Sequence, residues 1–125
     1  MEGTARKKIL VVDDDDFAQM TVQAMLTSIG REFLTAANGK EGIKQYQKNL
    51  KGVECILMDF NMPEMGGIEA TKQIRGFEKY VGLRVKIIGL TGDDSEEIIK
   101  EAMDVGMDDV VVKPVKKAKL EELFG

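Results

Sequence analysis

Short apolar runs alternate with longer amphipathic segments along the whole chain. Five of these runs are rich in β-branched side chains and are bounded by turn-forming residues, which is typical of buried strands. The predicted strands are Lys8 to Val12, Glu32 to Ala36, Glu54 to Met58, Val85 to Leu90 and Asp109 to Val112. All but the second are apolar nearly throughout, so we expect both faces of their sheet to be covered, as in parallel sheets flanked by helices.

The segments between the strands carry apolar residues at helical spacing. A period of about 3.6 residues brings such residues onto one face of a helix, which is then expected to be buried. The predicted faces consist of Met20, Ala24, Met25 and Ile29; of Ile43, Tyr46 and Leu50; of Ile68, Thr71 and Ile74; and of Ile98, Ala102 and Met103. A short last helix is expected near Leu120 to Phe124. The residues expected at helix ends are Asn38, Asp94 or Ser95 as N-caps, and Gly30 and Gly106 at C-termini.

The fivefold alternation of strand and helix predicts an α/β domain with a parallel sheet between two layers of helices. Right-handed crossovers make this a doubly wound sandwich, in which ligands bind outside the carboxyl ends of the strands. A chain of 125 residues has the usual size of one domain. We therefore expect residues 1–125 to form one domain with a core from about residue 7 to 124.

Composition and charge exclude several functional classes. Hydrophobic residues make up 43% of the chain and charged residues 32%, as in ordinary globular proteins. No stretch approaches the roughly 20 apolar residues that span a bilayer, and the first eight residues lack a signal-peptide core, so we expect a cytoplasmic protein without membrane contact. The 18 basic and 22 acidic residues are scattered, which argues against direct nucleic-acid binding. The single cysteine, Cys55, is predicted to be a small buried hydrophobe.

Residues that can carry chemistry follow four of the predicted strands. Asp13 to Asp16 follow the first strand, Asp59 the third, Thr91 the fourth and Lys113 the fifth. Because the carboxyl ends of parallel strands share one edge, we expect these side chains to meet in a single pocket. Each has a simpler explanation when taken alone: an acid after a strand is often a helix N-cap, which is our interpretation of Asp15 and Asp16. A lone threonine is most often a turn residue, and a lone lysine is most often exposed.

A pocket that contains Asp13, Asp14 and Asp59 needs compensating positive charge. Each pair of carboxylates repels by about one to a few kcal/mol at intermediate dielectric. Lys113 supplies one positive charge. Oxygen ligands beside open coordination positions suit Mg²⁺, or Mn²⁺ as an alternative, whereas a chain without histidine and with one cysteine offers no zinc site.

Five short motifs stand in a fixed order along the chain. They are Ile9-Leu-Val-Val-Asp-Asp14, Leu57-Met-Asp-Phe-Asn-Met-Pro63, Gly66-Gly67, Leu90-Thr-Gly92 and Val112-Lys-Pro114. In this order and spacing they resemble the receiver domains of bacterial, fungal and plant response regulators, over essentially the whole chain. The resemblance implies a flavodoxin-like (βα)5 fold with strand order 2-1-3-4-5, here with no output domain, and a role in a two-component phosphorelay.

The resemblance also implies a role for each site residue. Asp59 would accept the phosphoryl group, Asp14 would bind Mg²⁺ directly, and Asp13 would bind it through water. The backbone carbonyl of Asn61 would complete the protein ligands. Lys113 would neutralise charge on the phosphoryl oxygens.

Thr91 would hydrogen-bond the phosphoryl group once it arrives and draw its loop inward, a movement for which Gly92 leaves room. The resemblance thus implies a signalling phosphoacceptor rather than a metabolic enzyme, one that would promote its own phosphorylation and dephosphorylation. Asn61 and Asp93 stand where family members tune the attack of water, which predicts fairly rapid autodephosphorylation. The position that usually bears a Tyr or Phe for the switch is Val110 here.

The phosphodonor implied by the resemblance is a histidine kinase or a histidine phosphotransfer domain. The candidate contacts for this partner are Phe17, Met20, Pro114 and Val115, each of which could equally belong to the core. We expect a monomer before phosphorylation, with dimerisation after it as an alternative. The Lys113–Pro114 bond is expected to be cis, as in the family.

Two other functions compete with this interpretation. A degenerate receiver would keep the fold and serve only as a protein-interaction module, although the acceptor residues are all present here. A remoter alternative is an aspartyl phosphatase of the haloacid-dehalogenase type, whose motifs are similar to Asp13-x-Asp15 followed by Thr91 and Lys113. That family is larger and has an acidic pair downstream of its lysine, whereas Asp108-Asp109 precede Lys113.

Overall fold

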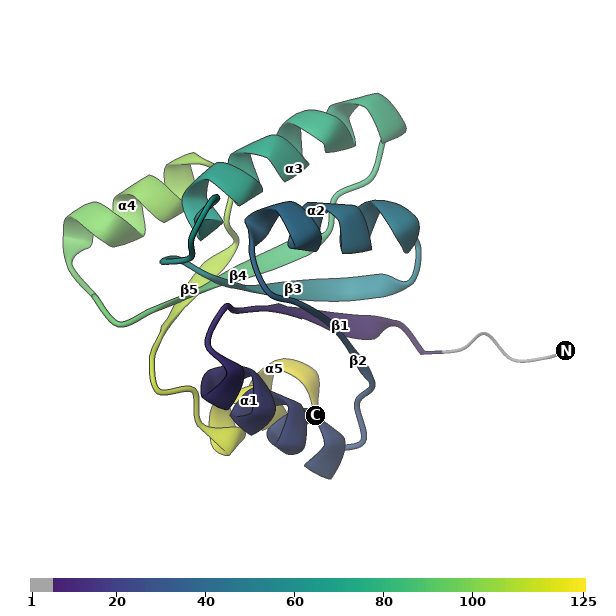
Figure 1. Cartoon of the computed structure of the whole chain (residues 1–125), viewed down its shortest axis with the longest axis vertical. Coiled ribbons are helices and arrows are strands. Elements are labelled where there is room, and N and C mark those ends of the chain that lie inside the picture. Colours follow the sequence, from purple (N-terminus) through teal and green to yellow (C-terminus); the bar gives the residue numbers. More distant parts are fainter. Residues whose placement is uncertain (1–5) are drawn as a thin grey trace, which may run out of the picture.

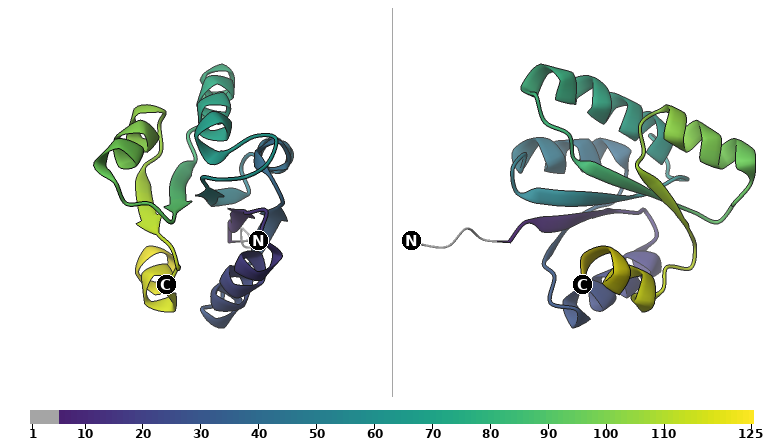
Figure 2. Two further views of the ribbon diagram at one scale, coloured as in Figure 1. Left: turned by 60° about the vertical axis from the view of Figure 1, so that its left-hand side comes forward. Right: turned by 180° about the vertical axis from the view of Figure 1, so that it is seen from behind.

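The computed structural model describes residues 6–125, which form five strands and five helices in strict alternation. Their order is β1 (Lys8–Val12), α1 (Asp16–Ser28), β2 (Phe33–Ala36), α2 (Gly39–Lys48), β3 (Val53–Asp59), α3 (Gly67–Val81), β4 (Lys86–Thr91), α4 (Glu96–Asp104), β5 (Asp109–Val112) and α5 (Lys117–Phe124). Helices α1 and α5 lie on one face of the sheet, and α2, α3 and α4 lie on the other (Figure 1 and Figure 2). The predicted doubly wound α/β sandwich is confirmed.

All five strands are parallel, and their order across the sheet is β2-β1-β3-β4-β5, as the family resemblance implies. Val12 at the end of β1 pairs with Ala36 in β2 and with Met58 in β3. Asp59, the last residue of β3, pairs with Leu90 in β4. The residues that follow these strands therefore emerge together, at what we call the carboxyl edge of the sheet.

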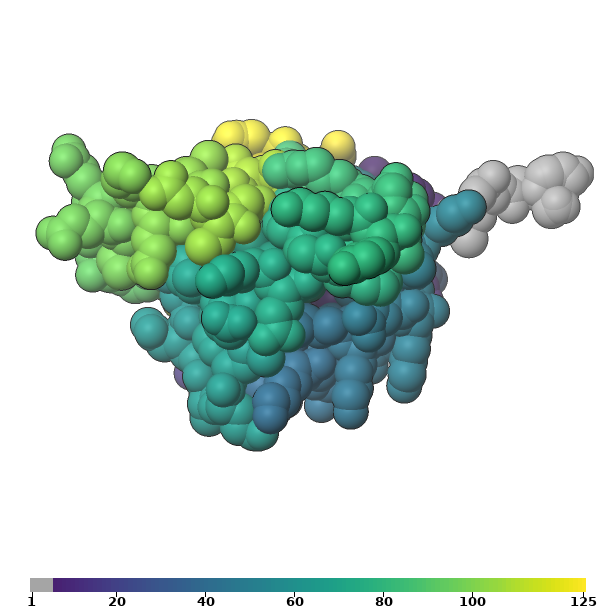
Figure 3. All heavy atoms as spheres, turned by 90° about the horizontal axis from the view of Figure 1, so that it is seen from above, coloured from purple at the N-terminus to yellow at the C-terminus, as the bar shows by residue number. Residues whose placement is uncertain are grey.

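Two apolar layers, one on each face of the sheet, stabilise this arrangement. In β1, Ile9 and Val11 pack against α1 and α5, whereas Leu10 and Val12 pack on the side of α2 and α3. All four side chains are completely buried. Successive residues of a strand point to opposite faces, so a sheet covered on both faces needs no polar alternation. Figure 3 shows α2, α3 and α4 side by side over one of these faces.

Cys55 lies in β3 within the layer that faces α1 and α5 and is completely buried. Burial raises the pKa of its thiol to about 12, so the thiolate is disfavoured at neutral pH. The prediction that this cysteine is a buried hydrophobe is confirmed. Among residues 6–125, no helix is both long enough and apolar enough to cross a membrane.

The element boundaries agree with the sequence to within a few residues. Strands β1 and β5 have the predicted bounds, β3 extends one residue further at each end, and α5 begins earlier, at Lys117. Asn38 and Ser95 are confirmed as N-caps, because their side chains accept from the backbone N–H groups of Glu41 and Ile98. Asp94, the alternative to Ser95, is not the cap.

The predicted buried face of the first helix is correct only in part. Helix α1 buries Gln19, Val22 and Leu26, whereas Met20 is 66% exposed. Of the predicted face, Met25 and Ile29 are half-buried and pack against the core, whereas Met20 and Ala24 are exposed. The polar side chain of Gln19 occupies the buried stripe because backbone carbonyls satisfy its amide group. In α4, Ala102 is buried as predicted, but Met103 is 47% exposed.

A polar network holds the opposite edge of the sheet, where the strands begin. The Arg75 side chain of α3 donates to the carbonyl oxygens of Val85 at 2.7 Å and Gly106 at 2.9 Å. It also pairs with Glu78 at 2.6 Å and with Asp108 at 3.0 Å. One guanidinium thus ties α3 to the start of β4 and to the loop before β5.

We expect Asp108→Asn to lower the free energy of unfolding at pH 7 by about 1–2 kcal/mol, because charged hydrogen bonds are lost. Burial alone would raise the pKa of Asp108, but the amide of Ile87 and the guanidinium groups of Arg84 and Arg75 outweigh it and lower the pKa. The stabilisation is therefore complete above the pKa of the unfolded chain and is lost as the pH falls through the lower folded-state pKa.

Urea denaturation of both proteins at a series of pH values measures this effect. The gap in stability should close on acidification below the ordinary range of aspartate. A gap that stays constant from neutral to strongly acidic pH would contradict the assigned role of the carboxylate charge.

Candidate functional site

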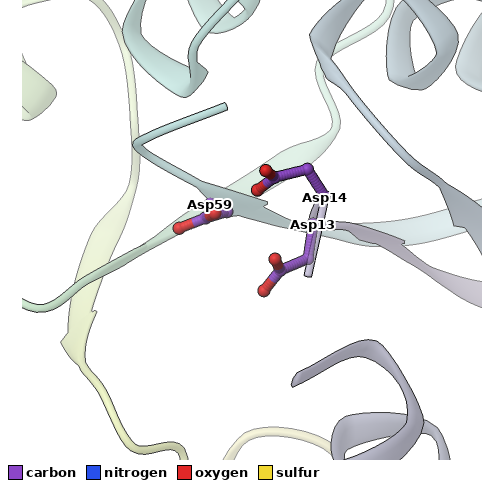
Figure 4. A group of neighbouring side chains, drawn as sticks. All are labelled: Asp13, Asp14 and Asp59. Atoms are coloured by element: carbon purple, nitrogen blue, oxygen red, sulfur yellow. The ribbon is translucent and has the colours of Figure 1, made fainter. Parts of the chain in front are cut away.

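Three carboxylates converge at the carboxyl edge of the sheet. Asp13 and Asp14 follow the last residue of β1, and Asp59 is the last residue of β3. Figure 4 shows the three side chains gathered around one space, and an oxygen atom from each lies within 4.8 Å of the others. Asp13 and Asp59 are 3% and 5% exposed, whereas Asp14 is open to solvent. The structure brings these residues together as the sequence predicts.

Lys113 completes this cluster from the loop after β5. Its Nζ atom lies 2.9 Å from Oδ1 of Asp59 and 3.3 Å from Oδ2 of Asp13. The backbone N–H of Lys113 donates to the carbonyl of Thr91 at 2.7 Å, which holds the loop against the end of β4. The peptide bond between Lys113 and Pro114 is cis, as the family resemblance implies.

The turn between β1 and α1 fixes the orientation of Asp13 and Asp14, the two acids that follow β1. The backbone N–H of Asp15 donates to Oδ1 of Asp13 at 2.9 Å, so both carboxylate oxygens of Asp13 have partners. The Asp15 side chain accepts from the N–H groups of Phe17 and Ala18, which confirms its role as the N-cap of α1. Asp14 lies between them, and its carboxylate accepts no hydrogen bond from any residue in 6–125.

The electrostatics of the cluster favour a bound cation. Burial raises the pKa of Asp59, Asp13 and Asp14 add to this effect, and Lys113 opposes it. Burial alone would lower the pKa of Lys113, but the carboxylates of Asp59 and Asp13 outweigh it and raise the pKa. Three carboxylates face one ammonium group, which leaves an excess of negative charge. Oxygen ligands that lie this close together, one of them open to solvent, fit a hard divalent cation such as Mg²⁺.

Thr91 lies at the end of β4, between the strand that carries Asp59 and the strand that precedes Lys113. It is 2% exposed. Its hydroxyl donates to the backbone carbonyl of Asp93 at 3.1 Å and accepts from the backbone N–H of the same residue at 3.0 Å. The Asp93 carboxylate accepts in turn from the N–H of Ser95 at 2.9 Å. Hydrogen bonds between Thr91, Asp93 and Ser95 therefore hold the loop after β4 in what we call its closed state.

The loop after Asp59 runs close to the strand that it leaves. Asn61 lies in this loop and is exposed. The backbone N–H of Gly67, the first residue of α3, donates to the carbonyl of Phe60 at 2.9 Å. A side chain at Gly67 would collide with the backbone carbonyl of Asp59, so only glycine allows α3 to begin here. The sequence supplied this residue as part of a motif but not the steric reason for it.

Gln19 is the residue near the site that sequence reasoning missed. It is 8% exposed, and its amide nitrogen donates to backbone carbonyls next to the acid cluster. The only signal in the sequence is its spacing, since Gln19 stands three and seven residues before the buried Val22 and Leu26. A polar residue on an apolar face usually marks a buried hydrogen-bonding group.

A groove beside the cluster contains most of the predicted partner contacts. Phe17, Pro114 and Val115 line it together with Lys113. Phe17 is 78% exposed and Pro114 is also exposed, whereas Val115 is half-buried and packs against the core. Met20 is exposed on the neighbouring turn of α1 and lines a different pocket. Phe17 and Met20 are therefore not part of the core.

Comparison with known proteins agrees with this geometry. The family model of the response regulator receiver domain matches residues 9–124. The chain is 34% identical over 116 residues to the chemotaxis protein CheY of Treponema pallidum, a match that covers 92% of this chain and 78% of that protein. The chain belongs to the response regulator receiver domain family. Receiver domains are components of two-component signalling rather than metabolic enzymes.

Other relatives of this receiver domain are much longer. It is 34% identical to hybrid signal transduction histidine kinase L of Dictyostelium discoideum, but the match covers 94% of this chain and only 7% of that protein. The receiver domain of the sensor histidine kinase PA1611 of Pseudomonas aeruginosa, with a magnesium ion coordinated in its active site cleft, is similar with a TM-score of 0.83. The two are 33% identical, and the match covers 95% of this chain and 94% of that one.

A second solved structure contains a phosphotransfer partner. It is the complex of the Saccharomyces cerevisiae histidine phosphotransfer signalling protein Ypd1 with the receiver domain of its response regulator Ssk1. It is similar to this receiver domain with a TM-score of 0.87 at 29% identity, and the match covers 98% of this chain and 88% of that chain.

We expect Asp59→Asn to raise the free energy of unfolding of this receiver domain by about 1 kcal/mol at pH 7 in the presence of EDTA. The substitution removes one of three mutually repelling carboxylates, and such a pair costs about one kcal/mol or more at intermediate dielectric. Added Mg²⁺ should stabilise the unsubstituted protein more than the variant, because ligand binding to the folded state adds to stability. Urea denaturation with EDTA or Mg²⁺ measures both effects. A variant that is less stable in EDTA would mean that attraction to Lys113 outweighs the repulsion.

Proposed function

We propose that this receiver domain accepts a phosphoryl group on Asp59 from a phosphohistidine donor and thereby relays or switches a signal. The observation that carries this proposal is the convergence of Asp13, Asp14, Asp59 and Lys113 on one space at the carboxyl edge of the sheet. These residues come from three different loops or strand ends, at the edge where this architecture binds ligands.

Mg²⁺ is the cofactor that this site suits, with Mn²⁺ as an alternative. The carboxylates of Asp14 and Asp59 and the backbone carbonyl of Asn61 would hold it directly, and Asp13 would hold it through water. When bound, the metal neutralises charge on the phosphoryl oxygens. The solved receiver domain of PA1611, which contains a magnesium ion in its active site cleft, supports this assignment.

Asp59 performs the chemical step as the nucleophile. One of its carboxylate oxygens attacks phosphorus, the oxygen–phosphorus bond forms, and the nitrogen–phosphorus bond of the donor breaks. The electron pair of that bond returns to the imidazole, which takes up a proton. Lys113, already 2.9 Å from Asp59, lies where it can contact the phosphoryl oxygens as they arrive. The protein therefore contributes mainly position and electrostatic stabilisation.

Thr91 couples the phosphoryl group to the loop after β4. Its hydroxyl donates to Asp93 in this structure, so it has to exchange that partner for a phosphoryl oxygen. The exchange would release the closed loop from Thr91 to Ser95 and change the surface next to α4. Val110 is half-buried on the adjacent strand and provides no aromatic ring, so the switch operates through the loop itself. Asn61, two residues after Asp59, and Asp93, two residues after Thr91, are polar residues at the positions that tune the attack of water, which supports fairly rapid autodephosphorylation.

The donor is a histidine kinase or a histidine phosphotransfer domain. The groove beside Lys113 provides a docking surface next to Asp59, because Phe17 is exposed there and Pro114 and Val115 line its other side. The similarity to the Ypd1–Ssk1 complex supports a phosphotransfer protein as one such partner. We expect a monomer before phosphorylation, and dimerisation after it would use a surface that the loop movement creates.

Incubation with acetyl phosphate and Mg²⁺ tests the acceptor assignment without any partner. We expect the intact mass to increase by one phosphoryl unit, and we expect no increase with EDTA or in Asp59→Asn. Asp104→Asn is the matched control, because Asp104 is an exposed aspartate in α4 whose side chain, within residues 6–125, pairs only with Lys100. It should be phosphorylated like the unsubstituted protein.

Two outcomes would contradict the proposal. An equal gain of mass in Asp59→Asn would place the acceptor elsewhere. No gain under any condition, combined with failure to bind beryllofluoride as a phosphoryl mimic, would favour a receiver fold that acts only as an interaction module.

A further inference from the structure

The amide nitrogen of Gln19 lies within hydrogen-bond distance of three backbone carbonyls at the carboxyl edge of the sheet, which share its two hydrogens. Its Nε2 atom lies 3.0 Å from the carbonyl of Val11, 3.3 Å from that of Asp13 and 2.9 Å from that of Ala36. The other end of the amide is also occupied, since Oε1 accepts from Nε2 of Gln23 at 3.0 Å. The side chain is thus fixed in one orientation and is almost completely buried.

These three carbonyls belong to two neighbouring strands at the point where the chain leaves them. Val11 lies inside β1, Asp13 is the first residue after β1, and Ala36 is the last residue of β2. The carbonyl of Ala36 also accepts from the backbone N–H of Asp13 at 3.1 Å. Gln19 therefore connects α1 to the ends of β1 and β2, next to the turn that carries Asp13 and Asp14.

The anchoring of Asp13 determines where Asp14 can lie. The backbone of Asp13 is held by Gln19 and Ala36, and its carboxylate is held by the N–H of Asp15 and by Lys113. Asp14 follows directly, and its carboxylate accepts no hydrogen bond from residues 6–125. The neighbouring backbone is therefore what orients this exposed acid. Groups that orient a metal ligand in this way commonly affect metal affinity by 10-fold or more.

We propose that Gln19 is a positioning residue for the metal-binding acids, which it holds by fixing the backbone of Asp13. This inference rests on the proposed function, in which Asp14 and Asp13 bind Mg²⁺. Gln19 itself touches neither the metal nor the phosphoryl group. A purely structural role would also explain a buried amide that satisfies three carbonyls. The two roles differ in what happens to metal affinity when the amide is removed.

The test compares Mg²⁺ affinity with stability in three variants. Gln19→Met keeps the length of the side chain but removes the donor, so we expect the Mg²⁺ dissociation constant from calorimetric titration to rise about 10-fold. Gln19→Asn keeps an amide on a shorter stem that cannot reach all three carbonyls, and we expect it to weaken Mg²⁺ binding as well. Tyr46→Phe is the control, because it removes a buried hydrogen bond to Glu78 at the opposite edge of the sheet. It should lower stability to urea without changing Mg²⁺ affinity.

A second readout requires no metal. In EDTA, the backbone amides of Asp13 and Asp15, which donate to Ala36 and to the Asp13 carboxylate, should exchange hydrogen faster in Gln19→Met than in the Tyr46→Phe control. The comparison is made at matched global stability, set by adding urea, so that loosening of the turn is separated from global unfolding.

The outcomes distinguish this inference from the proposed function. A variant Gln19→Met that loses stability but keeps Mg²⁺ affinity and slow exchange would overturn the positioning role. If Gln19→Met does not fold, Gln19→Asn replaces it, because its shorter amide cannot reach all three carbonyls. Unchanged affinity in that variant would likewise overturn the role. If the unsubstituted protein itself binds no Mg²⁺, the proposed function fails, and the exchange rates alone then decide whether Gln19 holds the turn.

Discussion

Electrostatic repulsion among Asp13, Asp14 and Asp59 is the constraint that the carboxyl edge of the sheet has to overcome. Three carboxylates whose oxygens lie within 4.8 Å of one another are not stable by themselves, and Lys113 offsets only part of the repulsion. The cluster is held by the rest of the fold, through the two apolar layers and the polar network around Arg75 at the opposite edge. The packing of the core therefore holds the three carboxylates together, although they repel one another. A bound cation would reduce this repulsion.

The parallel sheet determines which groups share this site. In the order β2-β1-β3-β4-β5, the strand that carries Asp59 and the strand that precedes Lys113 are separated only by β4. Thr91 at the end of β4 therefore lies between Asp59, the proposed acceptor, and the lysine, where its hydroxyl would respond to a new group on Asp59. Its present bond to Asp93 gives the loop a closed state that phosphorylation would open. The positions of the acids, the compensation of their charge by Lys113 and the proposed switch at Thr91 thus all depend on one strand order.

The fold and the acid cluster could be predicted from sequence because they follow from patterns of residue type. Runs without polar alternation predicted a sheet covered on both faces, and acids after β1 and β3 predicted where charge would gather. The buried face of α1 could be predicted only in part: Met25 and Ile29 pack against the core, but Met20 is exposed and the polar Gln19 is buried. Gln19 is buried because of backbone carbonyls that only the folded chain brings together. Two of the partners of Arg75, Gly106 and Asp108, lie 31 and 33 residues from it in sequence, and no local pattern identifies them.

A crystal structure of the protein with Mg²⁺ and beryllofluoride would test the central claim most directly. We expect beryllium bonded to the carboxylate of Asp59, the metal in contact with Asp14 and Asp59, and Lys113 beside the fluorides. We also expect the Thr91 hydroxyl to donate to a fluoride instead of to Asp93. Beryllofluoride absent from Asp59, or a metal bound away from the three acids, would contradict the account.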